Sequence, residues 1–301
     1  MADSEPAPPA LKTYRGNCHC GLFVYEAQLP EIKSVAECNC SLCYKKGYLW
    51  VFPGAGDFKV VKGSEDDLTT YTLGGAATTL HRFCPTCGTP VMAFRPGSPP
   101  GKQVGLNAHA IQDLNTWDLT IIPFDGRALP PAWEEPKYTG PEPPVSEDAP
   151  ADKSKIYAGS CHCGAVTLAV RSIPLDNTYP QWVKVCSCSI CERMGATWIY
   201  PKASQVIING LENCTKYLFG RKIVAKAFCK TCGVCICNMA ADLSPEEYEA
   251  LSDEYKGWVK TSSEFCVLNL RVLNGWDLGE IKDKIERFTG GAEVEPRYVN
   301  P

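Results

Sequence analysis

The sequence Cys38-Asn-Cys40-Ser-Leu-Cys43 places three thiols within six residues, and it returns later in the chain as Cys186-Ser-Cys188-Ser-Ile-Cys191. Soft sulfur ligands suit a zinc ion, and three of them leave the fourth position of a tetrahedral shell free. A cluster of four thiolates is usually structural, whereas a cluster of three can accept a substrate or a water molecule. The two stretches therefore predict two open metal sites, whose six cysteines we expect to be catalytic.

Two further elements repeat in the same order around these stretches. Tyr14-Arg-Gly-Asn-Cys18-His-Cys20-Gly21 returns as Tyr157-Ala-Gly-Ser-Cys161-His-Cys163-Gly164, and Phe83-Cys84-Pro-Thr-Cys87-Gly88 returns as Phe228-Cys229-Lys-Thr-Cys232-Gly233. Chance can produce one such match, but an ordered set indicates a tandem duplication. We expect an unstructured tail at 1–13, a first domain at 14–138, a proline-rich acidic linker at 139–155 and a second domain at 156–301.

The C-x-x-C turn of each copy needs a second pair of thiols to close a tetrahedral site. In the first copy either Cys18 with Cys20 or Cys38 with Cys40 qualifies, and the spacing alone does not choose between them. Either choice divides the seven repeated cysteines of a copy into one set of four and one set of three. The sequence therefore predicts up to two zinc ions per domain and four per chain.

The apolar runs are short and are interrupted by proline and glycine, which favours a mainly β fold. We expect strands near residues 22–27, 49–52, 58–61 and 104–106, and near 166–170, 197–200, 206–208 and 266–270 in the second copy. Helical patterns are rare. Ser244, Pro245 and Glu247 form the capping pattern of a helix over 244–251, and a further helix is expected over 278–288.

The net charge of −4 and the 21% of charged residues are typical of a globular protein without a general attraction to nucleic acid or membrane surfaces. The sequence has no apolar run long enough to cross a bilayer, and its N-terminus lacks the pattern of a signal peptide. We therefore expect a cytoplasmic protein. Thiols stay reduced in the cytosol, so the 18 cysteines are better explained as metal ligands than as disulfides.

The combined motifs G-x-C-H-C-G, C-x-C-S-x-C-x-x-x-G and F-C-x-x-C-G resemble the glutathione-dependent formaldehyde-activating enzyme family, also called the centromere-protein-V-like family. They lie at 16–21, 38–47 and 83–88, and again at 159–164, 186–195 and 228–233. The resemblance implies a zinc-bearing β-tent of the Mss4-like group in each copy. It also implies one closed structural site per copy, formed by Cys18, Cys20, Cys84 and Cys87 in the first and by Cys161, Cys163, Cys229 and Cys232 in the second. The open sites that it implies are Cys38, Cys40 and Cys43 in the first copy and Cys186, Cys188 and Cys191 in the second.

The same resemblance implies a carbon–sulfur lyase that acts on a glutathione adduct or a related small-thiol conjugate, such as an S-(hydroxyalkyl) adduct. The thiol sulfur would take the open position of the zinc. A non-catalytic zinc-stabilised binding module is the alternative. A third interpretation is a redox enzyme like the B-type methionine-sulfoxide reductases, which would place a reactive thiol at Cys266.

Several residues near the clusters have two interpretations. Lys45, Lys46 and Arg193 flank the open clusters and could bind the glutathione carboxylates, or they could be solvated charges of a turn. His19 and His162 lie between ligands, and we expect their rings to point away from the metal. A homo-oligomer is possible. Four cysteines lie outside the repeat, and we expect them to be buried free thiols. These cysteines are Cys214, Cys235, Cys237 and Cys266.

Overall fold

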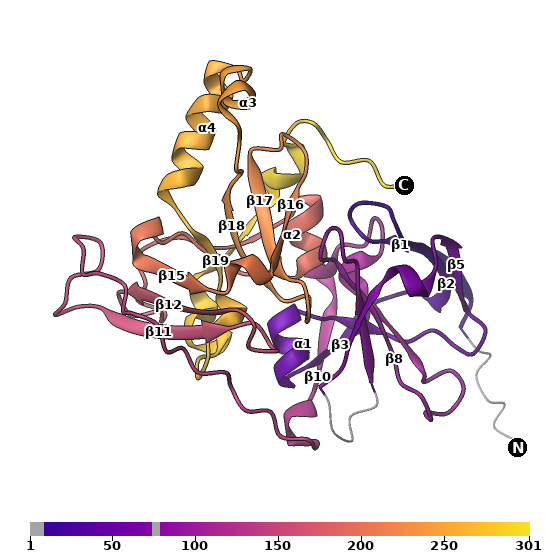
Figure 1. Cartoon of the computed structure of the whole chain (residues 1–301). Coiled ribbons are helices and arrows are strands. Elements are labelled where there is room, and N and C mark those ends of the chain that lie inside the picture. Colours follow the sequence, from indigo (N-terminus) through magenta and orange to yellow (C-terminus); the bar gives the residue numbers. More distant parts are fainter. Residues whose placement is uncertain (1–8, 74–78) are drawn as a thin grey trace, which may run out of the picture.

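The structure is a computed structural model that describes residues 9–73 and 79–301 (Figure 1). Its strands form two three-stranded sheets and two seven-stranded sheets, one of each size in each half of the chain. The predicted mainly β class with two tandem domains of similar design is confirmed. Short strands punctuated by glycine and proline turns produce sheets of this kind, because each turn ends a strand after a few residues.

The first half contains a small sheet in the order β1-β2-β5 and a large sheet in the order β10-β3-β4-β9-β8-β7-β6. Strand β10 runs parallel to β3, whereas the other pairs of the large sheet are antiparallel. The bounds are β1 Leu11–Asn17, β2 Val24–Pro30, β3 Ser34–Cys38, β4 Trp50–Val51, β5 Phe58–Lys62, β6 Thr69–Tyr71, β7 Leu80–Phe83, β8 Pro90–Phe94, β9 Val104–Asn107 and β10 Thr120–Phe124.

The second half repeats this arrangement, with a small sheet β11-β12-β15 and a large sheet β16-β17-β18-β19-β14-β13-β20. Strand β20 runs parallel to β13, as β10 does to β3. The bounds are β11 Lys155–Ser160, β12 Thr167–Ser172, β13 Val183–Cys186, β14 Trp198–Ile199, β15 Val206–Asn209, β16 Cys214–Leu218, β17 Val224–Cys229, β18 Cys235–Ala240, β19 Val267–Asn269 and β20 Ile285–Phe288.

A short helix follows each C-x-C stretch, α1 at Ser41–Lys46 and α2 at Ser189–Met194. Each helix ends at a glycine in the left-handed region, Gly47 with φ +60° and Gly195 with φ +55°, which suits glycine because it has no Cβ. The helix thus turns back within a few residues and leads into β4 or β14. This hairpin-like path holds the three thiols of each open cluster together.

Most sequence-based expectations for the secondary structure are confirmed. A strand overlaps each of the eight predicted runs, and helix α3 (Pro245–Glu249) is capped by Ser244, which forms the expected capping box with Glu247. Helix α4 (Asp253–Glu264) was not predicted. The helix expected over 278–288 is wrong: a 3₁₀-helix spans Leu278–Lys284, and the chain then enters β20, because pairing with β13 satisfies its backbone groups.

The segments outside the two repeats were assigned from composition. Of the tail expected at 1–13, residues 1–8 lie outside the described residues, and β1 already begins at Leu11, where it pairs with Pro30. The linker at 139–155 runs mostly as irregular backbone along the second half, where Arg171 donates to the carbonyl of Pro143 at 2.7 Å. The domain boundaries themselves remain a prediction.

The two halves pack against each other near α1 and α2, which lie in the middle of the molecule (Figure 1). The rings of Phe83 and Phe228 meet edge to face with their centroids 6.4 Å apart. Beside them, a Cβ added to Gly47 would lie 2.3 Å from the carbonyl oxygen of Gly195, and the reverse distance is 2.4 Å. Because equivalent residues meet, the halves are related by an approximate twofold axis.

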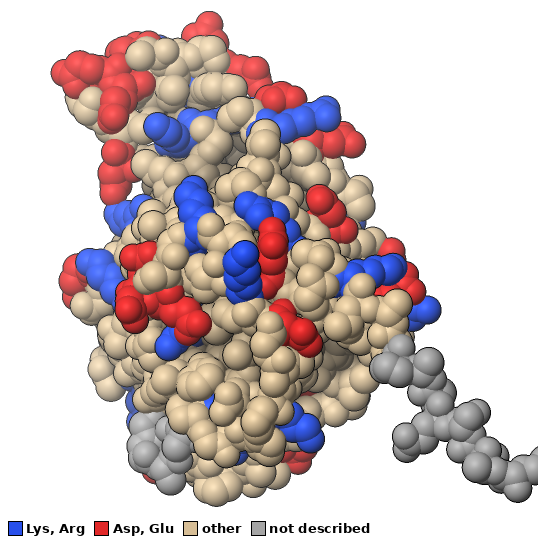
Figure 2. All heavy atoms as spheres, turned by 90° about the vertical axis from the view of Figure 1, so that its right-hand side faces the viewer, with Lys and Arg blue, Asp and Glu red and all other residues tan. Residues whose placement is uncertain are grey.

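The helices and the surface charge bear on possible membrane and nucleic-acid partners. None of the helices within residues 9–73 and 79–301 is long and apolar enough to span a membrane. Figure 2 shows basic and acidic side chains interspersed over one face of the molecule, with acidic groups gathered at its upper end. A mixed surface of this kind gives no broad positive field for a nucleic acid on that face.

Candidate metal centres

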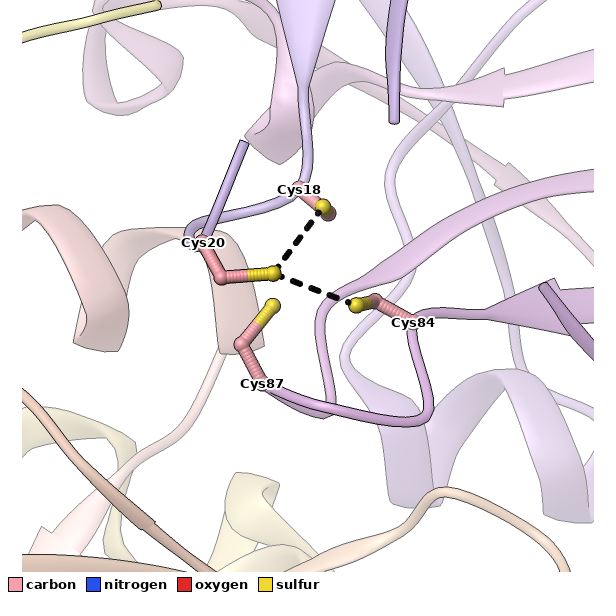
Figure 3. Close-up of side chains that lie close together, drawn as sticks. All are labelled: Cys18, Cys20, Cys84 and Cys87. Atoms are coloured by element: carbon pink, nitrogen blue, oxygen red, sulfur yellow. Dashed lines mark hydrogen bonds between the residues drawn. The ribbon is translucent and has the colours of Figure 1, made fainter. Parts of the chain in front are cut away.

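The closed cluster of the first half brings together two cysteines from the end of β1 and two from the β7–β8 turn. Their four sulfurs lie within 4.8 Å of one another (Figure 3). The sulfurs of Cys18 and Cys20 are 3.6 Å apart, and those of Cys20 and Cys84 are 3.5 Å apart. A tetrahedral zinc with Zn–S bonds of about 2.3 Å needs sulfurs about 3.8 Å apart, so the set fits this ion. Cys87 completes it.

Backbone and side-chain donors support the sulfurs of this cluster. The Phe23 N–H donates to Cys18 Sγ at 3.3 Å, and Thr89 Oγ1 lies 3.2 Å from Cys87 Sγ. Such contacts fix the ligand geometry before a metal binds. The pairing that spacing left open, Cys18 with Cys20 rather than Cys38 with Cys40, is thus the one that the structure assembles.

The second half contains the equivalent closed cluster. Cys163 Sγ lies 3.5 Å from Cys161 Sγ and 3.6 Å from Cys229 Sγ, and the Val166 N–H donates to Cys161 at 3.3 Å. Cys232 is the fourth member. The agreement between the two halves, sulfur by sulfur, indicates that both keep the same ligand arrangement.

The two open clusters also form as expected, at the junctions of β3 with α1 and of β13 with α2. Cys38, Cys40 and Cys43 lie within 4.8 Å of one another, as do their counterparts Cys186, Cys188 and Cys191. The backbone N–H of Cys40 donates to Cys38 Sγ at 3.5 Å. Hydrogen bonds from Cys40 and Cys43 lower the pKa of Cys38 to about 3, whereas the same contacts raise the pKa of Cys40 and Cys43, so Cys38 is the first thiolate of the cluster.

Each open cluster faces a large cavity built from both halves. The first cavity, of about 930 Å³, is lined by Cys38, Cys40 and Cys43 and by second-half residues that include Trp276 and Glu280. The second cavity, of about 1060 Å³, is lined by Cys186 and Cys188 and also by first-half residues, among them His19, Gln112 and Asp113. Either site is therefore incomplete without the opposite half.

His19 connects the closed cluster of the first half to the open cluster of the second. Its Nε2 lies 2.9 Å from Ser189 Oγ, next to Cys188, and its Nδ1 lies 2.9 Å from Tyr217 Oη. Tyr298 stacks on the ring at 4.4 Å. Burial lowers the pKa of His19 to about 4, so the ring is neutral near pH 7.

His162 makes the mirror set of contacts from the second half to the first. Its Nε2 lies 3.0 Å from Ser41 Oγ, its Nδ1 lies 2.8 Å from Tyr71 Oη, and Trp133 stacks on the ring at 4.7 Å. Neither histidine belongs to a thiol cluster. These contacts are consistent with the expectation that both rings point away from the metal. The sequence did not reveal that each ring contacts the opposite half.

Lys45 is buried in the interface between the halves rather than exposed in a turn. Its ammonium donates to the carbonyls of Ser160 and Val272 at 3.1 and 3.0 Å and to Asn274 Oδ1 at 2.9 Å. These acceptors use all three N–H groups, so none is left for a glutathione carboxylate. The interpretation of Lys45 as a solvated charge is therefore wrong, although the residue also lines the first cavity.

Arg193 and Lys46 are likewise buried and are not solvated charges of a turn. Arg193 mirrors Lys45, since its guanidinium donates to the carbonyl of Asn17 at 3.2 Å and to Asn300 Oδ1 at 2.8 Å. Lys46 is 2% exposed, with its ammonium 4.4 Å from the centroid of Phe83. Burial lowers the pKa of Lys46 to about 8. Both side chains are buried, although Arg193 also lines the second cavity.

The expected free thiols are confirmed. Cys214, Cys235, Cys237 and Cys266 are buried, and all 18 cysteines are free, which excludes the disulfide alternative in this structure. Cys266 lines neither of the two large cavities. Its buried side chain and its distance from both cavities do not favour a redox role, which needs an accessible thiol.

Two functional candidates escaped the sequence analysis, Lys226 and His81. Lys226 Nζ donates to Cys191 Sγ at 3.0 Å, and His81 lines the first cavity. They occupy equivalent positions, two residues before Phe228 and Phe83. A comparison of the two repeats residue by residue would have revealed that one copy has lysine where the other has histidine. It would not have revealed the contact between Lys226 and the thiol.

The chain is similar to a known protein family and to solved structures. The chain matches the family described as "Glutathione-dependent formaldehyde-activating enzyme" over residues 13–120 and again over 156–250. These segments contain every cysteine of the four clusters. Among solved structures, a Rhodobacter sphaeroides protein is similar, with 32% sequence identity, coverage of 36% of this chain and 97% of that chain, and a TM-score of 0.32.

Proposed function

The chain belongs to the glutathione-dependent formaldehyde-activating enzyme family, and from this premise we propose that it is a zinc-dependent carbon–sulfur lyase. The proposed substrate is a glutathione adduct, or the adduct of another small thiol, of the S-(hydroxyalkyl) type. The observation that carries the proposal is a three-sulfur cluster beside each cavity, with all three cysteines lining the first cavity and Cys186 and Cys188 lining the second. A structural site would require a fourth protein ligand, and the clusters of the described residues contain three.

The proposed reaction breaks the bond between the thiol sulfur and the hydroxyl-bearing carbon. The electron pair of that bond goes to sulfur, the hydroxyl proton leaves, and the carbon becomes an aldehyde carbonyl. When bound, zinc supplies the positive charge that stabilises the departing thiolate. Cys38, Cys40 and Cys43 would hold it in the first half, and Cys186, Cys188 and Cys191 in the second.

The cavities supply candidate contacts for the rest of the substrate. Arg95, Lys102 and Arg127 line the first cavity, and Lys184 and Lys222 line the second. Glutathione carries two carboxylates, which such cations recognise by charge-assisted hydrogen bonds. We therefore assign the carboxylate contacts to these residues in place of the buried Lys45, Lys46 and Arg193.

Serine substitution of one ligand in each open cluster tests the reaction. We expect Cys40→Ser and Cys188→Ser to lower turnover by at least about 100-fold at the altered site, since loss of even a residue that only supports a metal ligand costs 10–100-fold. The measurement is aldehyde release from S-(hydroxymethyl)glutathione by the zinc-loaded full chain. The double variant should show no turnover above the uncatalysed rate.

The matched control is Cys214→Ser, which alters a buried thiol outside the clusters. It should keep both zinc content and turnover. If the double variant Cys40→Ser/Cys188→Ser retains the activity of this control, the open clusters are not the catalytic sites and the lyase proposal is wrong.

Glutathione itself separates the lyase from the binding-module alternative. If the thiol occupies the open position, glutathione at 100 times its dissociation constant should stabilise the folded chain by about 2.7 kcal/mol. The readout is the melting temperature of the zinc-loaded protein with glutathione and with its S-methyl derivative, which offers no thiolate. Equal shifts, or none, would favour a zinc-stabilised module without a thiol site.

Two further assignments belong to the proposal. Eighteen free cysteines suit a reducing compartment, and we propose the cytosol. A homo-oligomer is not needed to complete either cavity, because the opposite half of the same chain already supplies the missing wall.

A further inference from the structure

The two open clusters differ in the group that donates to the buried cysteine of each. In the first half the Trp50 indole N–H donates to Cys43 Sγ at 3.4 Å. In the second half the donor to Cys191 Sγ is the ammonium of Lys226, at 3.0 Å. The equivalent tryptophan, Trp198, leaves its own indole N–H without a partner among the described residues. A neutral donor in one half is therefore replaced by a cation in the other.

Lys226 is held in place by its surroundings. It extends from β17 and is 2% exposed, and its ammonium lies 4.3 Å from the centroid of the Trp198 ring. It does not line the second cavity, whereas Cys186 and Cys188 do. The ammonium thus reaches Cys191 from the protein interior and leaves the cavity side of the cluster open to a ligand.

The first half has no such contact among its described residues. The position equivalent to Lys226 holds His81, which is 4% exposed and whose Nδ1 has no hydrogen-bond partner there. Burial lowers the pKa of His81 to about 3, so its ring is neutral near pH 7. Lys46 brings a cation into this region, but its ammonium makes no hydrogen bond within the described structure.

The charge on the cluster explains why this difference matters. Three thiolates and one zinc carry one net negative charge, and an incoming thiolate adds a second. A buried cation in contact with one of the sulfurs offsets part of that charge. It also draws electron density from Cys191, which leaves the metal better able to accept another anionic donor.

We propose that Lys226 tunes the second cluster toward anionic thiolate ligands, so that the two halves of the chain bind the thiol unequally and the second half binds it more tightly. The inference rests on the proposed function for the thiol as fourth ligand. Lys226 is a positioning and tuning residue, because it acts through Cys191 and does not touch the substrate.

The test compares Lys226→Met with His81→Met in the full chain loaded with cobalt(II), which reports on thiolate ligation by its absorption. Removing the ammonium should raise the dissociation constant for glutathione at the second cluster by 10–100-fold, the usual effect of a residue that supports a metal ligand. The affinity for imidazole, a neutral fourth ligand, should stay unchanged. His81→Met should alter neither constant at the second cluster.

A second readout does not require glutathione to bind. Loss of the Lys226 hydrogen bond makes the Cys191 sulfur a stronger donor, so the sulfur-to-cobalt charge-transfer band should move to longer wavelength in Lys226→Met and not in His81→Met. If neither cluster of the unaltered protein binds glutathione, the proposed function fails. If the band does not move, or if the affinities for imidazole and for glutathione fall together in Lys226→Met, the role of Lys226 is overturned. This holds whether or not the proposed function is correct.

Discussion

Replacing Cys84 by serine is expected to unfold the first half of the chain and to remove more than one zinc ion. The side chain is fully buried in the closed cluster, where four thiols from two distant segments converge. Serine is a poor zinc ligand, and structural zinc of this type contributes about 10–16 kcal/mol of apparent binding free energy in small zinc domains. A loss of that size is comparable with the total stability of a typical domain, about 5–15 kcal/mol.

The loss should extend into the second half because the halves share contacts around this cluster. His19, between two ligands of the closed cluster, lies 2.9 Å from Ser189 Oγ beside the opposite open cluster. The turn after Cys87 places Gly88 against Phe228, with a built Cβ only 2.6 Å from that ring. We therefore expect zinc to fall from four ions per chain to two or fewer.

Zinc content by elemental analysis and circular dichroism of the purified chain check this prediction. Cys214→Ser is again the control, since it removes a buried thiol without removing a ligand. A Cys84→Ser protein that kept four zinc ions and the melting temperature of the control would show that the closed cluster is not a structural metal site.

The membership of the clusters could be predicted because the ligands come in short local pairs that recur in order. Cys18 and Cys20, or Cys84 and Cys87, lie close in space wherever the chain places them. Joining the correct pairs required more, since either of two C-x-C pairs met the spacing rule. The family resemblance supplied that choice, and the structure assembles the same sets.

The roles of the charged residues could not be predicted because they depend on how the halves pack. Lys45 donates to Ser160, 115 positions away, and Arg193 donates to Asn17, 176 positions away. Local sequence around a turn predicts solvent for such residues. The contact between Lys226 and Cys191 likewise depends on where β17 lies beside α2, which no spacing rule contains.

The secondary structure shows the same limit at the C-terminus. The apolar spacing over 278–288 resembles a helix, yet residues Ile285–Phe288 pair in parallel with Val183–Cys186. A strand that pairs with a segment about 100 residues earlier satisfies its backbone there, and this gain outweighs a weak local preference. The first half shows the same topology, with β10 parallel to β3. Aligning the two repeats would therefore have indicated a strand at Ile285–Phe288.

The second large effect is expected at the contact between the halves, from Gly195→Ala. A Cβ at this position would lie 2.4 Å from the carbonyl oxygen of Gly47, a backbone atom that cannot move aside without shifting α1. Overpacking of this kind costs about 1–3 kcal/mol. Alanine at φ +55° adds strain of about 1–2 kcal/mol from the left-handed conformation itself.

Gly220→Ala separates the strain from the clash. Gly220 has φ +54°, nearly the same as Gly195, but a Cβ built there meets nothing within 4 Å. Both variants therefore carry the left-handed strain, and Gly195→Ala alone carries the contact between the halves. At about 2–4 °C per kcal/mol, the melting temperature of Gly195→Ala should lie roughly 2–12 °C below that of Gly220→Ala.

The approximate twofold axis adds a further condition to this experiment. Gly47→Ala creates the reciprocal clash, with its Cβ 2.3 Å from the carbonyl oxygen of Gly195, so it should destabilise the chain as much as Gly195→Ala does. Each variant pushes both helices apart, and each helix carries an open cluster at its start. Turnover should therefore fall at both sites in either variant. Equal melting temperatures for Gly195→Ala and Gly220→Ala would mean that the halves do not pack through this contact in solution.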